Sequence, residues 1–552
     1  MEDRAVYLRE VVEQAPRLIG LIDRNPGSRT YGCFDRQYWH YNTTDFPCAE
    51  YQESVLTLAY LFLLPHGTNP YCGEPCLLEW INAGIGFWRA IQNRNGAFAE
   101  WYPYENSMSV TPFSTYAVSE TLLLMGDRIR ERRRTIASLK KAGNWLLRHK
   151  DLRVANHYSG STIALYNLYL LTGEEAYRQG AERIVSELHR LQDEEGWFVE
   201  YKGADVGYTS VTLYYLAQYY KKTHDPNAKD IIARALDFLF FFMHPDGTFG
   251  GEYGSRNTEY LIPNGFEIMA PHLPKAALIG RRVRESLHHK GHVAPFAFDD
   301  RYLCYLGYMY IQAYADAPED EAEGETAFPE NFVREFPNAG LRVIDNPSFF
   351  CVQSLKKGGL FKIDFKVNGR SFLDGGIVIV DRKGRGHYSF YFDQDGKADV
   401  DGSSLRVERK MARIPGHVLT PAGNVLQRLF ATTLGRIEWV ESLVKNLLRD
   451  ILVTNVKISS FHHSREVCLS EKDCTVIDRM DGIRDIRELQ VGARGSYVYG
   501  PSTRFFQPAG LGSVPLALRR SDLERHDHKR ILRIVRVFDV EGNLLSSEIS
   551  SE

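Results

Sequence analysis

Gly196-Trp-Phe-Val-Glu-Tyr201 is one of three copies of a short pattern in which a glycine is followed by an aromatic residue, an acid and a second aromatic residue. The other copies are Gly96-Ala-Phe-Ala-Glu-Trp101 and Gly247-Thr-Phe-Gly-Gly-Glu-Tyr253. Gly196 and Gly247 are 51 residues apart, and Gly96 and Gly196 are 100 apart. Looser copies fall at the same phase near residues 32–41, 151–157 and 295–301. Six loops at a spacing of about fifty residues predict a closed ring of six helical hairpins.

The segments between these loops have the pattern of amphipathic helices. Residues 181–191 and 230–242 carry apolar positions at helical spacing, with charges on the other face. A single hairpin cannot bury its apolar stripe, so neighbours are expected to stack. The glycine is expected to end a helix and turn the loop inward, so that the aromatic residue and acid after it face a common cavity. The alternative, that the glycines are only caps and the aromatic residues only fill the core, stays open for any single loop.

The chain changes character after Tyr314. An acidic stretch, residues 316–326, is poor in apolar residues, and from residue 341 short runs of Val, Ile, Phe and Tyr alternate with glycine turns, as β-strands do. Candidate strands are residues 359–369, 376–381, 388–392, 404–409, 453–459, 476–478 and 532–540, with an inserted helix at 437–448. We therefore predict an α+β multidomain chain with an (α/α) toroid over residues 1–315, an acidic linker over 316–340 and an antiparallel β-sandwich over 341–552.

The composition is that of a soluble globular protein without a strong overall charge. Its 67 basic and 70 acidic residues give a formal charge of −3, which supplies no field for recruiting nucleic acid. The N-terminal residues have no signal-peptide-like apolar run, and the longest apolar run, residues 238–243, is far shorter than the roughly 20 residues of a membrane span. We therefore expect a cytoplasmic protein with no nucleic-acid or membrane partner, and the oligomeric state stays open.

The cysteines give no sign of a metal site. Eight are scattered along the chain, and only Cys72 and Cys76 lie close together, without a second pair at zinc-site spacing. No cofactor is expected, although a structural divalent metal stays open.

Three stretches carry a resemblance to a known family. Asn156-His157 stands at the start of a predicted helix, Tyr208 follows about fifty residues later in Gly203-Ala-Asp-Val-Gly-Tyr208, and Asp35–Pro47 looks like a substrate-groove loop. A toroid followed by a β domain, with these motifs, resembles the heparinase II/III-like polysaccharide lyases and the related alginate lyases over nearly the full length.

The resemblance implies β-elimination beside a uronate carboxylate, in which the C5 proton is removed and the bond to the C4 oxygen breaks. Asn156 would donate its amide hydrogens to that carboxylate and favour the enolate-like transition state. His157 or Tyr208 would take the proton, and the other would protonate the leaving oxygen. A tyrosine, with a pKa of about 10, needs a cationic neighbour to act as a base, and Arg256 is the candidate.

An acidic oligo- or polysaccharide is the expected partner. The residues expected to bind it come from the repeat loops and from the segment near Asp35: Arg36, Trp39, His40, Glu100, Trp101, Trp197, Glu200, Tyr201, Glu252, Tyr253, Arg256 and Asn257.

One departure from the family pattern concerns the β domain. The family has a histidine-rich segment that reaches from this domain into the toroid, whereas residues 354–362 here read Ser-Leu-Lys-Lys-Gly-Gly-Leu-Phe-Lys. His387 and the His462-His463 pair are possible substitutes outside the family's motif.

Two other functions remain open. A toroid glycoside hydrolase needs two carboxylates across a cleft. Acids that could serve are Glu100, Glu200, Asp205, Glu252 and Glu259. A non-catalytic protein for glycan binding or polysaccharide assembly on the same scaffold is the third possibility.

Overall fold

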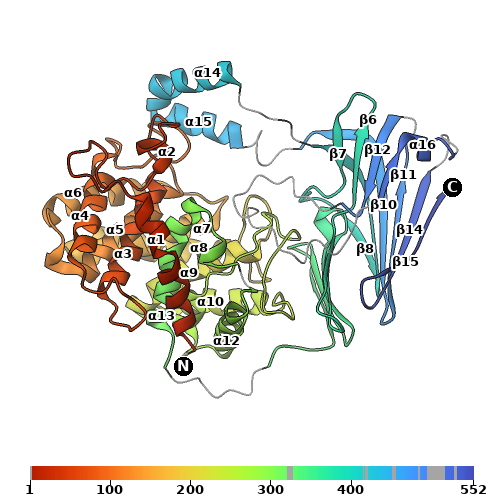
Figure 1. Cartoon of the computed structure of the whole chain (residues 1–552), viewed down its shortest axis with the longest axis horizontal. Helices are drawn as coiled ribbons and strands as arrows, with labels where there is room; N and C mark the ends of the chain where they lie inside the picture. Colours follow the sequence, from red (N-terminus) through yellow and green to blue (C-terminus); the bar gives the residue numbers. More distant parts are fainter. Residues whose placement is uncertain are drawn as a thin grey trace.

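The computed structural model describes residues 3–291, 293–319, 327–414, 416, 420–449, 456–482, 485–493, 516–526 and 531–552. Six inner helices contact one another in sequence, and the last contacts the first, so they close a ring (Figure 1). They are α3 (Ser54–Leu63), α5 (Val110–Met125), α7 (Ala155–Thr172), α9 (Val206–Thr223), α11 (Asn264–Met269) and α13 (Asp300–Asp316). Each pairs with one outer helix: α4 (Pro75–Ala90), α6 (Arg132–Leu146), α8 (Glu175–Leu191), α10 (Pro226–Leu239), α12 (Pro274–His288) and, for α13, α1 (Ala5–Leu21). The predicted toroid of about six hairpins is confirmed, and the N-terminal helix closes it.

The ring of inner helices is more deeply buried than the ring of outer helices, because the two sets of helices differ in sequence. In the inner helix α9, 14 of 18 residues are buried, whereas the outer helix α8 buries 6 of 17. A helix that is apolar all round must be enclosed, and one with a single apolar stripe covers it from outside. None of the described helices is long and apolar enough to span a bilayer.

The repeated glycine allows neighbouring hairpins to approach closely. Gly96 and Gly196 have φ angles of 102° and 97°, which other residues rarely adopt. A Cβ at Gly96 would lie 2.2 Å from the carbonyl oxygen of Lys141, and one at Gly196 would lie 2.1 Å from that of Arg234. The pattern therefore repeats because each loop presses on an outer helix.

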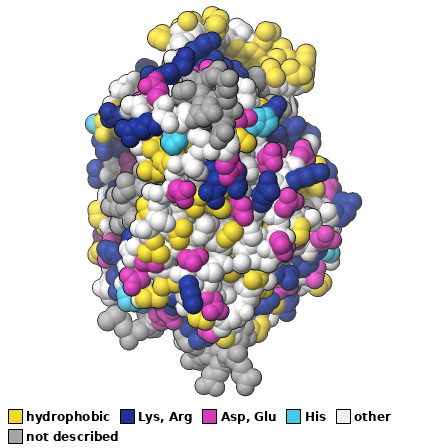
Figure 2. Space-filling view, turned by 90° about the vertical axis from the view of Figure 1, so that its right-hand side faces the viewer, with side chains coloured by type: hydrophobic (Ala, Val, Ile, Leu, Met, Phe, Trp, Pro, Cys, Tyr) yellow, Lys and Arg dark blue, Asp and Glu magenta, His cyan; other side chains and the backbone are white. Residues whose placement is uncertain are grey.

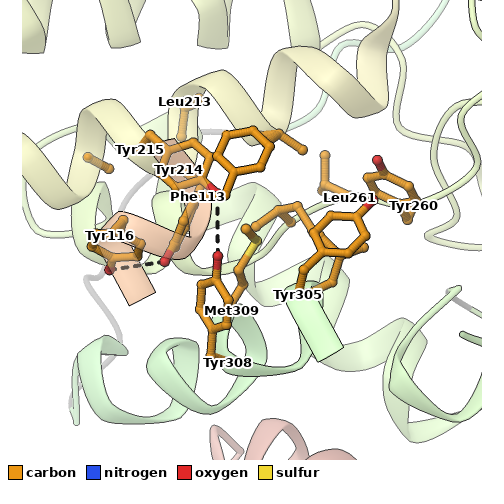
Figure 3. Close-up of a cluster of buried hydrophobic side chains, with 14 of the residues drawn as sticks. Phe113, Tyr116, Leu213, Tyr214, Tyr215, Tyr260, Leu261, Tyr305, Tyr308 and Met309 are labelled. Carbon is orange, nitrogen blue, oxygen red and sulfur yellow. Dashed lines mark hydrogen bonds between the residues drawn. The ribbon is translucent and has the colours of Figure 1, made fainter. Parts of the chain in front are cut away.

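The centre of the ring is filled with tyrosines (Figure 3). Tyr116 of α5, Tyr214 and Tyr215 of α9 and Tyr308 of α13 are all fully buried. Their hydroxyls pair, with Tyr214 3.1 Å from Tyr116 and Tyr215 3.3 Å from Tyr308. These tyrosines, from a chain that has 31 in all, thus serve the core, where a buried hydroxyl needs a hydrogen-bond partner.

The C-terminal domain contains two antiparallel sheets packed face to face. The first has the order β1 (Phe332–Phe336), β2 (Leu341–Asp345), β3 (Phe349–Ser354), β4 (Leu360–Phe365) and β5 (Ser371–Asp374). The second has the order β13 (Leu516–Arg519), β12 (Ile486–Val491), β6 (Ile377–Asp381), β7 (Gly386–Tyr388), β9 (Ser404–Arg413), β10 (Ile458–Leu469), β11 (Asp473–Met480), β14 (Leu532–Asp539) and β15 (Leu544–Ser551), with β8 (Ala398–Asp401) beside β9. Phe361 of the first sheet and Val467 of the second share one core, so the predicted sandwich is confirmed.

Two details depart from the expected boundaries. Strand β1 begins at Phe332, inside the segment predicted as a linker, because Phe332 and Phe336 pack on Phe241 of the toroid. The candidate strand at 453–459 falls partly outside the described residues, and β10 begins at Ile458. The predicted helix at 437–448 is present as α15 (Glu438–Arg449), preceded by α14 (Pro421–Thr432). Figure 1 shows this pair lying over the toroid, away from the sheets between which it is inserted in sequence.

Candidate functional site

The predicted catalytic residues lie at the start of two neighbouring inner helices. Asn156 and His157 are the second and third residues of α7, and Tyr208 is the third residue of α9, which packs beside α7. An acid caps each helix: Glu200 Oε1 accepts from the Asn156 backbone N–H at 3.1 Å, and Asp205 Oδ1 accepts from that of Tyr208 at 3.1 Å. These two acids, of which Glu200 belongs to the repeat, thus fix the helix starts at one end of the toroid.

Both capping acids are completely buried. Burial raises the pKa of Glu200 well above its usual value and also raises that of Asp205, although hydrogen bonds from backbone N–H groups oppose the shift. Glu200 Oε2 also accepts from Asn156 Nδ2 at 2.7 Å. The Asn156 amide is therefore held at the helix start by a carboxyl group that itself has an unusual pKa.

Arg256 places a positive charge beside Tyr201 and Tyr208 at the loop end of the toroid. Its guanidinium lies 4.3 Å above the centre of the Tyr201 ring, and its backbone N–H donates to Asp205 Oδ2 at 3.0 Å. Burial raises the pKa of Tyr208, and Arg256 opposes that shift. Burial likewise raises the pKa of Tyr201 to about 12, again opposed by Arg256. Tyr201, Tyr208, Glu200 and Arg256 are thus close enough to one another for their charges to interact.

His157 is oriented by a carboxylate. Its Nδ1 lies 3.3 Å from Asp151 Oδ2, and its side chain is 17% exposed. Because a carboxylate only accepts hydrogen bonds, the neutral ring carries its hydrogen on Nδ1 and leaves the Nε2 lone pair available as a base.

A lysine of the β domain enters the toroid where the family pattern led us to look for a histidine. Lys357, 1% exposed, donates from Nζ to the backbone oxygens of Glu252 at 2.5 Å and Gly254 at 3.0 Å, and to Asn257 Oδ1 at 2.5 Å. Burial lowers the pKa of its ammonium group to about 8. Lys357 thereby fixes the loop that carries Arg256. The Lys356-Lys357 pair in the region lacking the histidine was the available signal in the sequence.

Arg301 is a second residue that the sequence analysis did not select. It pairs with Glu50 and, at 2.7 Å, with Glu100, and its guanidinium lies 4.8 Å from the centre of the Trp101 ring. Trp101 is 44% exposed. The signal for Arg301 was its place in the looser repeat at 295–301.

Several other predicted residues are buried in the core or contact other parts of the chain, away from Asn156, His157 and Tyr208. The first aromatic residues of the repeat, Phe98, Phe198 and Phe249, are fully buried, which corrects the expectation that they face a cavity: they fill the core. Trp197 is 8% exposed and donates to Glu195, whose carboxylate accepts backbone N–H groups of the β domain. Tyr253 is 1% exposed, with its hydroxyl 3.1 Å from His244 Nε2.

The segment near residue 35 and the β-domain histidines form separate groups. Trp39 donates to the Leu21 carbonyl at 2.8 Å, Arg36 lies over Tyr41, and His40 is exposed beside Trp39. His387 is buried against Asp381, His463 is buried against Asp478, and His462 is exposed. Both buried histidines are held by acids of the β domain itself, so neither takes the place that Lys357 occupies.

The described ranges contain no group of three or more His, Cys, Asp or Glu side chains that could hold a metal ion. Glu252 and Glu259 are half-buried neighbours, and burial followed by the charge of Glu252 raises the pKa of Glu259 to about 7.

Residues 80–261, which include the starts of α7 and α9, match the model of the ulvan lyase N-terminal domain family. Chondroitin AC lyase of Streptomyces coelicolor A3, solved in complex with chondroitin sulphate, superposes with a TM-score of 0.54 and 12% identity over 88% of this chain and 68% of that chain. Heparinase III superposes with a TM-score of 0.41 and 10% identity over 90% of this chain and 73% of that chain. No curated protein matches the sequence. The family match over residues 80–261 and the fold shared with chondroitin AC lyase confirm the predicted resemblance to polysaccharide lyases in which a helical toroid precedes a β domain.

Proposed function

We propose that the chain cleaves an acidic, uronate-containing polysaccharide by β-elimination at the loop end of the toroid. The observation that carries the proposal is that His157 and Tyr208 occupy the same third position of adjacent helices α7 and α9, with the Arg256 charge beside Tyr208. Packed helices lie about 8–10 Å apart, a distance that two such side chains span around one sugar unit. The family match and the acidic glycan bound to chondroitin AC lyase support the substrate class.

The electrostatics suggest which residue is the base. Burial raises the pKa of Tyr208 even with Arg256 nearby, so this hydroxyl keeps its proton at neutral pH and suits a general acid. His157, held through Nδ1 by Asp151, offers Nε2 as the base. His157 takes the C5 proton, the electron pair of the C–H bond forms the C4–C5 double bond, and the leaving C4 oxygen takes the Tyr208 proton.

The substrate carboxylate needs neutralisation for this step, because its charge keeps the C5 proton weakly acidic. Asn156 Nδ2 carries two hydrogens and gives one to Glu200, and we assign the second to the carboxylate. Arg256, 5% exposed, supplies the positive charge beside it.

The test is to incubate the protein with a panel of acidic polysaccharides and to follow the ultraviolet absorbance of the unsaturated uronate product. We expect the wild type to generate it, and Tyr208→Phe to lose turnover by about 10²–10⁴-fold while still binding the glycan. Tyr166→Phe, nine residues after His157 on α7 and half-buried, is the matched control and should keep full turnover. Absence of new absorbance on every uronate-containing glycan would sink the proposal.

A hydrolase is the second candidate, and Glu259 is the observation that favours it. A carboxyl group with a pKa of about 7 beside a second acid is suited to general acid catalysis. New reducing ends without ultraviolet absorbance, lost in Glu259→Gln and retained in Tyr208→Phe, would identify this activity instead.

A further inference from the structure

The helix pair α14–α15 exposes an unusual number of apolar side chains. Trp439 is 72% exposed and Leu426 is 67% exposed, values that large apolar side chains seldom reach. We call the following eight residues the apolar face: Val425, Leu426, Leu429, Leu434, Ile437, Trp439, Leu443 and Leu447, each at least 45% exposed. Figure 2 shows hydrophobic side chains gathered at the top of the molecule, where α14 and α15 lie in Figure 1.

The polar side of this pair is turned toward the toroid, which is the reverse of a normal amphipathic helix on a protein surface. Glu438 accepts from Trp145 Nε1 at 2.9 Å and lies 2.8 Å from His149 Nε2. The other charged residues of 421–448 also meet toroid partners: Glu441 with Tyr102 at 2.7 Å, Lys445 with Glu105 at 2.6 Å, Arg428 with Asp45 at 3.1 Å and Arg436 over the Tyr104 ring at 4.2 Å. Polar contacts therefore hold the pair in place, and its apolar side is left for a partner.

The size of the apolar face fits a protein partner. Contiguous exposed apolar patches larger than a few hundred Å² mark interaction sites. Eight large side chains, each about half to three quarters exposed, supply an area on the order of the 800 Å² that each partner contributes to a standard interface.

The charges argue against a bilayer as the partner. Helices that bind at a membrane surface place Lys and Arg beside the apolar face to meet anionic headgroups. In residues 421–448, by contrast, Arg428, Arg436 and Lys445 are each engaged with the toroid. An uncharged apolar surface fits a second uncharged apolar surface, and a second copy of this chain necessarily offers one.

We propose that the apolar face is the interface of a two-fold symmetric dimer, in which α14 and α15 of one protomer pack against α14 and α15 of its partner. Each half then buries the same residues, as an isologous interface requires. Because α15 lies on Tyr102 and Glu105, the dimer places the partner beside the loop that carries Trp101. This inference does not depend on the proposed enzymatic activity.

Sedimentation velocity of the full chain over a concentration series tests the proposal. We expect a dimer at micromolar concentration, and Leu443→Glu combined with Leu426→Glu should weaken dimerisation at least 100-fold because four like charges would enter an apolar interface. Both positions face solvent, so the variant should keep the wild-type circular dichroism spectrum and unfolding midpoint. Val367→Glu, 62% exposed on the β domain, is the matched control and should remain dimeric.

Three results would overturn the proposal. These are a wild type that stays monomeric at tens of micromolar, a dimer that the double variant leaves intact, and a monomer that floats with phosphatidylserine vesicles and loses this binding in the double variant. The last result would assign the apolar face to a membrane surface.

Discussion

Two buried groups of charged residues, one in each domain, differ in how their charges are balanced. In the β domain, Arg465 and Arg536 lie against Asp374 and Asp478, with Arg465 Nε and Arg536 Nη2 each 3.0 Å from Asp478 and His463 Nε2 2.9 Å from it. At the loop end of the toroid, Glu200 and Asp205 are equally buried, but their contacts are backbone and amide N–H groups.

The pKa shifts reflect this difference. Burial alone would raise the pKa of Asp478, yet Arg465, His463 and Arg536 hold it far below its usual value. Burial raises the pKa values of Glu200 and Asp205, and no cation pairs directly with either carboxylate among the contacts described for them to offset this shift. Removing one partner from a balanced buried group is strongly destabilising, whereas raised carboxyl pKa values in an unbalanced group are typical of functional sites. The toroid group is therefore the one to test for activity.

The largest effect is expected from breaking the balanced group. Asp478→Ala removes the acceptor for three buried donors, so we expect a loss of about 3–5 kcal/mol in the free energy of unfolding. Calorimetry should show the loss in the β-domain transition, while turnover per folded molecule stays unchanged. A large fall in turnover with little loss of stability would reverse our assignment of the two groups.

The second effect concerns the unbalanced group. Glu200→Gln places an NH₂ group where the carboxylate accepted from Asn156 Nδ2, so the Asn156 amide must turn. We expect turnover to fall on the order of 10²-fold, as a displacement of about 1 Å at a reacting centre does. Glu175→Gln, at an exposed site on α8, is the control.

The same variant predicts a pH effect on stability. The pKa of Glu200 is higher in the folded than in the unfolded state. The stabilisation that this carboxyl group gives to the fold is therefore fully present below its unfolded-state pKa, and it is lost as the pH rises toward its folded-state pKa. Wild type should therefore lose stability relative to Glu200→Gln as pH rises above about 4.5. A difference between the two unfolding curves that is constant with pH would contradict the raised pKa.

A smaller effect is expected where the β domain reaches the toroid. Lys357→Met leaves the Glu252 and Gly254 carbonyls and the Asn257 amide oxygen without this donor, so we expect a stability loss of about 1–3 kcal/mol and a roughly tenfold lower kcat with little change in KM. The adjacent Lys356→Met removes only a contact with the Asn338 carbonyl and is the control. Because the folded pKa of Lys357 is about 8, below the unfolded value, wild type should gain stability relative to Lys357→Met between pH 8 and about 10.5.

The sequence predicted the ring because its glycines carry a geometric requirement that repeats with the hairpins. Gly96 and Gly196 lie where a side chain would collide with the next outer helix. The spacing of the hairpins could therefore be read from the spacing of these glycines in the sequence. The sequence did not show which way each side chain of the loop points. Phe198 enters the core and Glu200 caps α7, although both follow the same glycine. Lys357 and Arg301 were missed because their contacts join distant parts of the sequence: Lys357 and Asn257 are 100 residues apart, and Arg301 and Glu100 are 201 apart. No local pattern records such a contact.

The smallest effect separates a contact that binds glycan from one that only packs. Trp101 is 44% exposed beneath the Arg301 guanidinium, so its ring offers one face to a sugar while a cation on the protein orients it. We expect Trp101→Ala to raise KM about fivefold, which corresponds to about 1 kcal/mol, and to leave kcat unchanged. Trp80→Ala is the matched control, because Trp80 also lies beneath an arginine, Arg24, but on an outer helix. Equal effects of the two variants on KM would show that the Arg301–Trp101 contact is structural, and would confine substrate binding to the group around Tyr208 and Arg256.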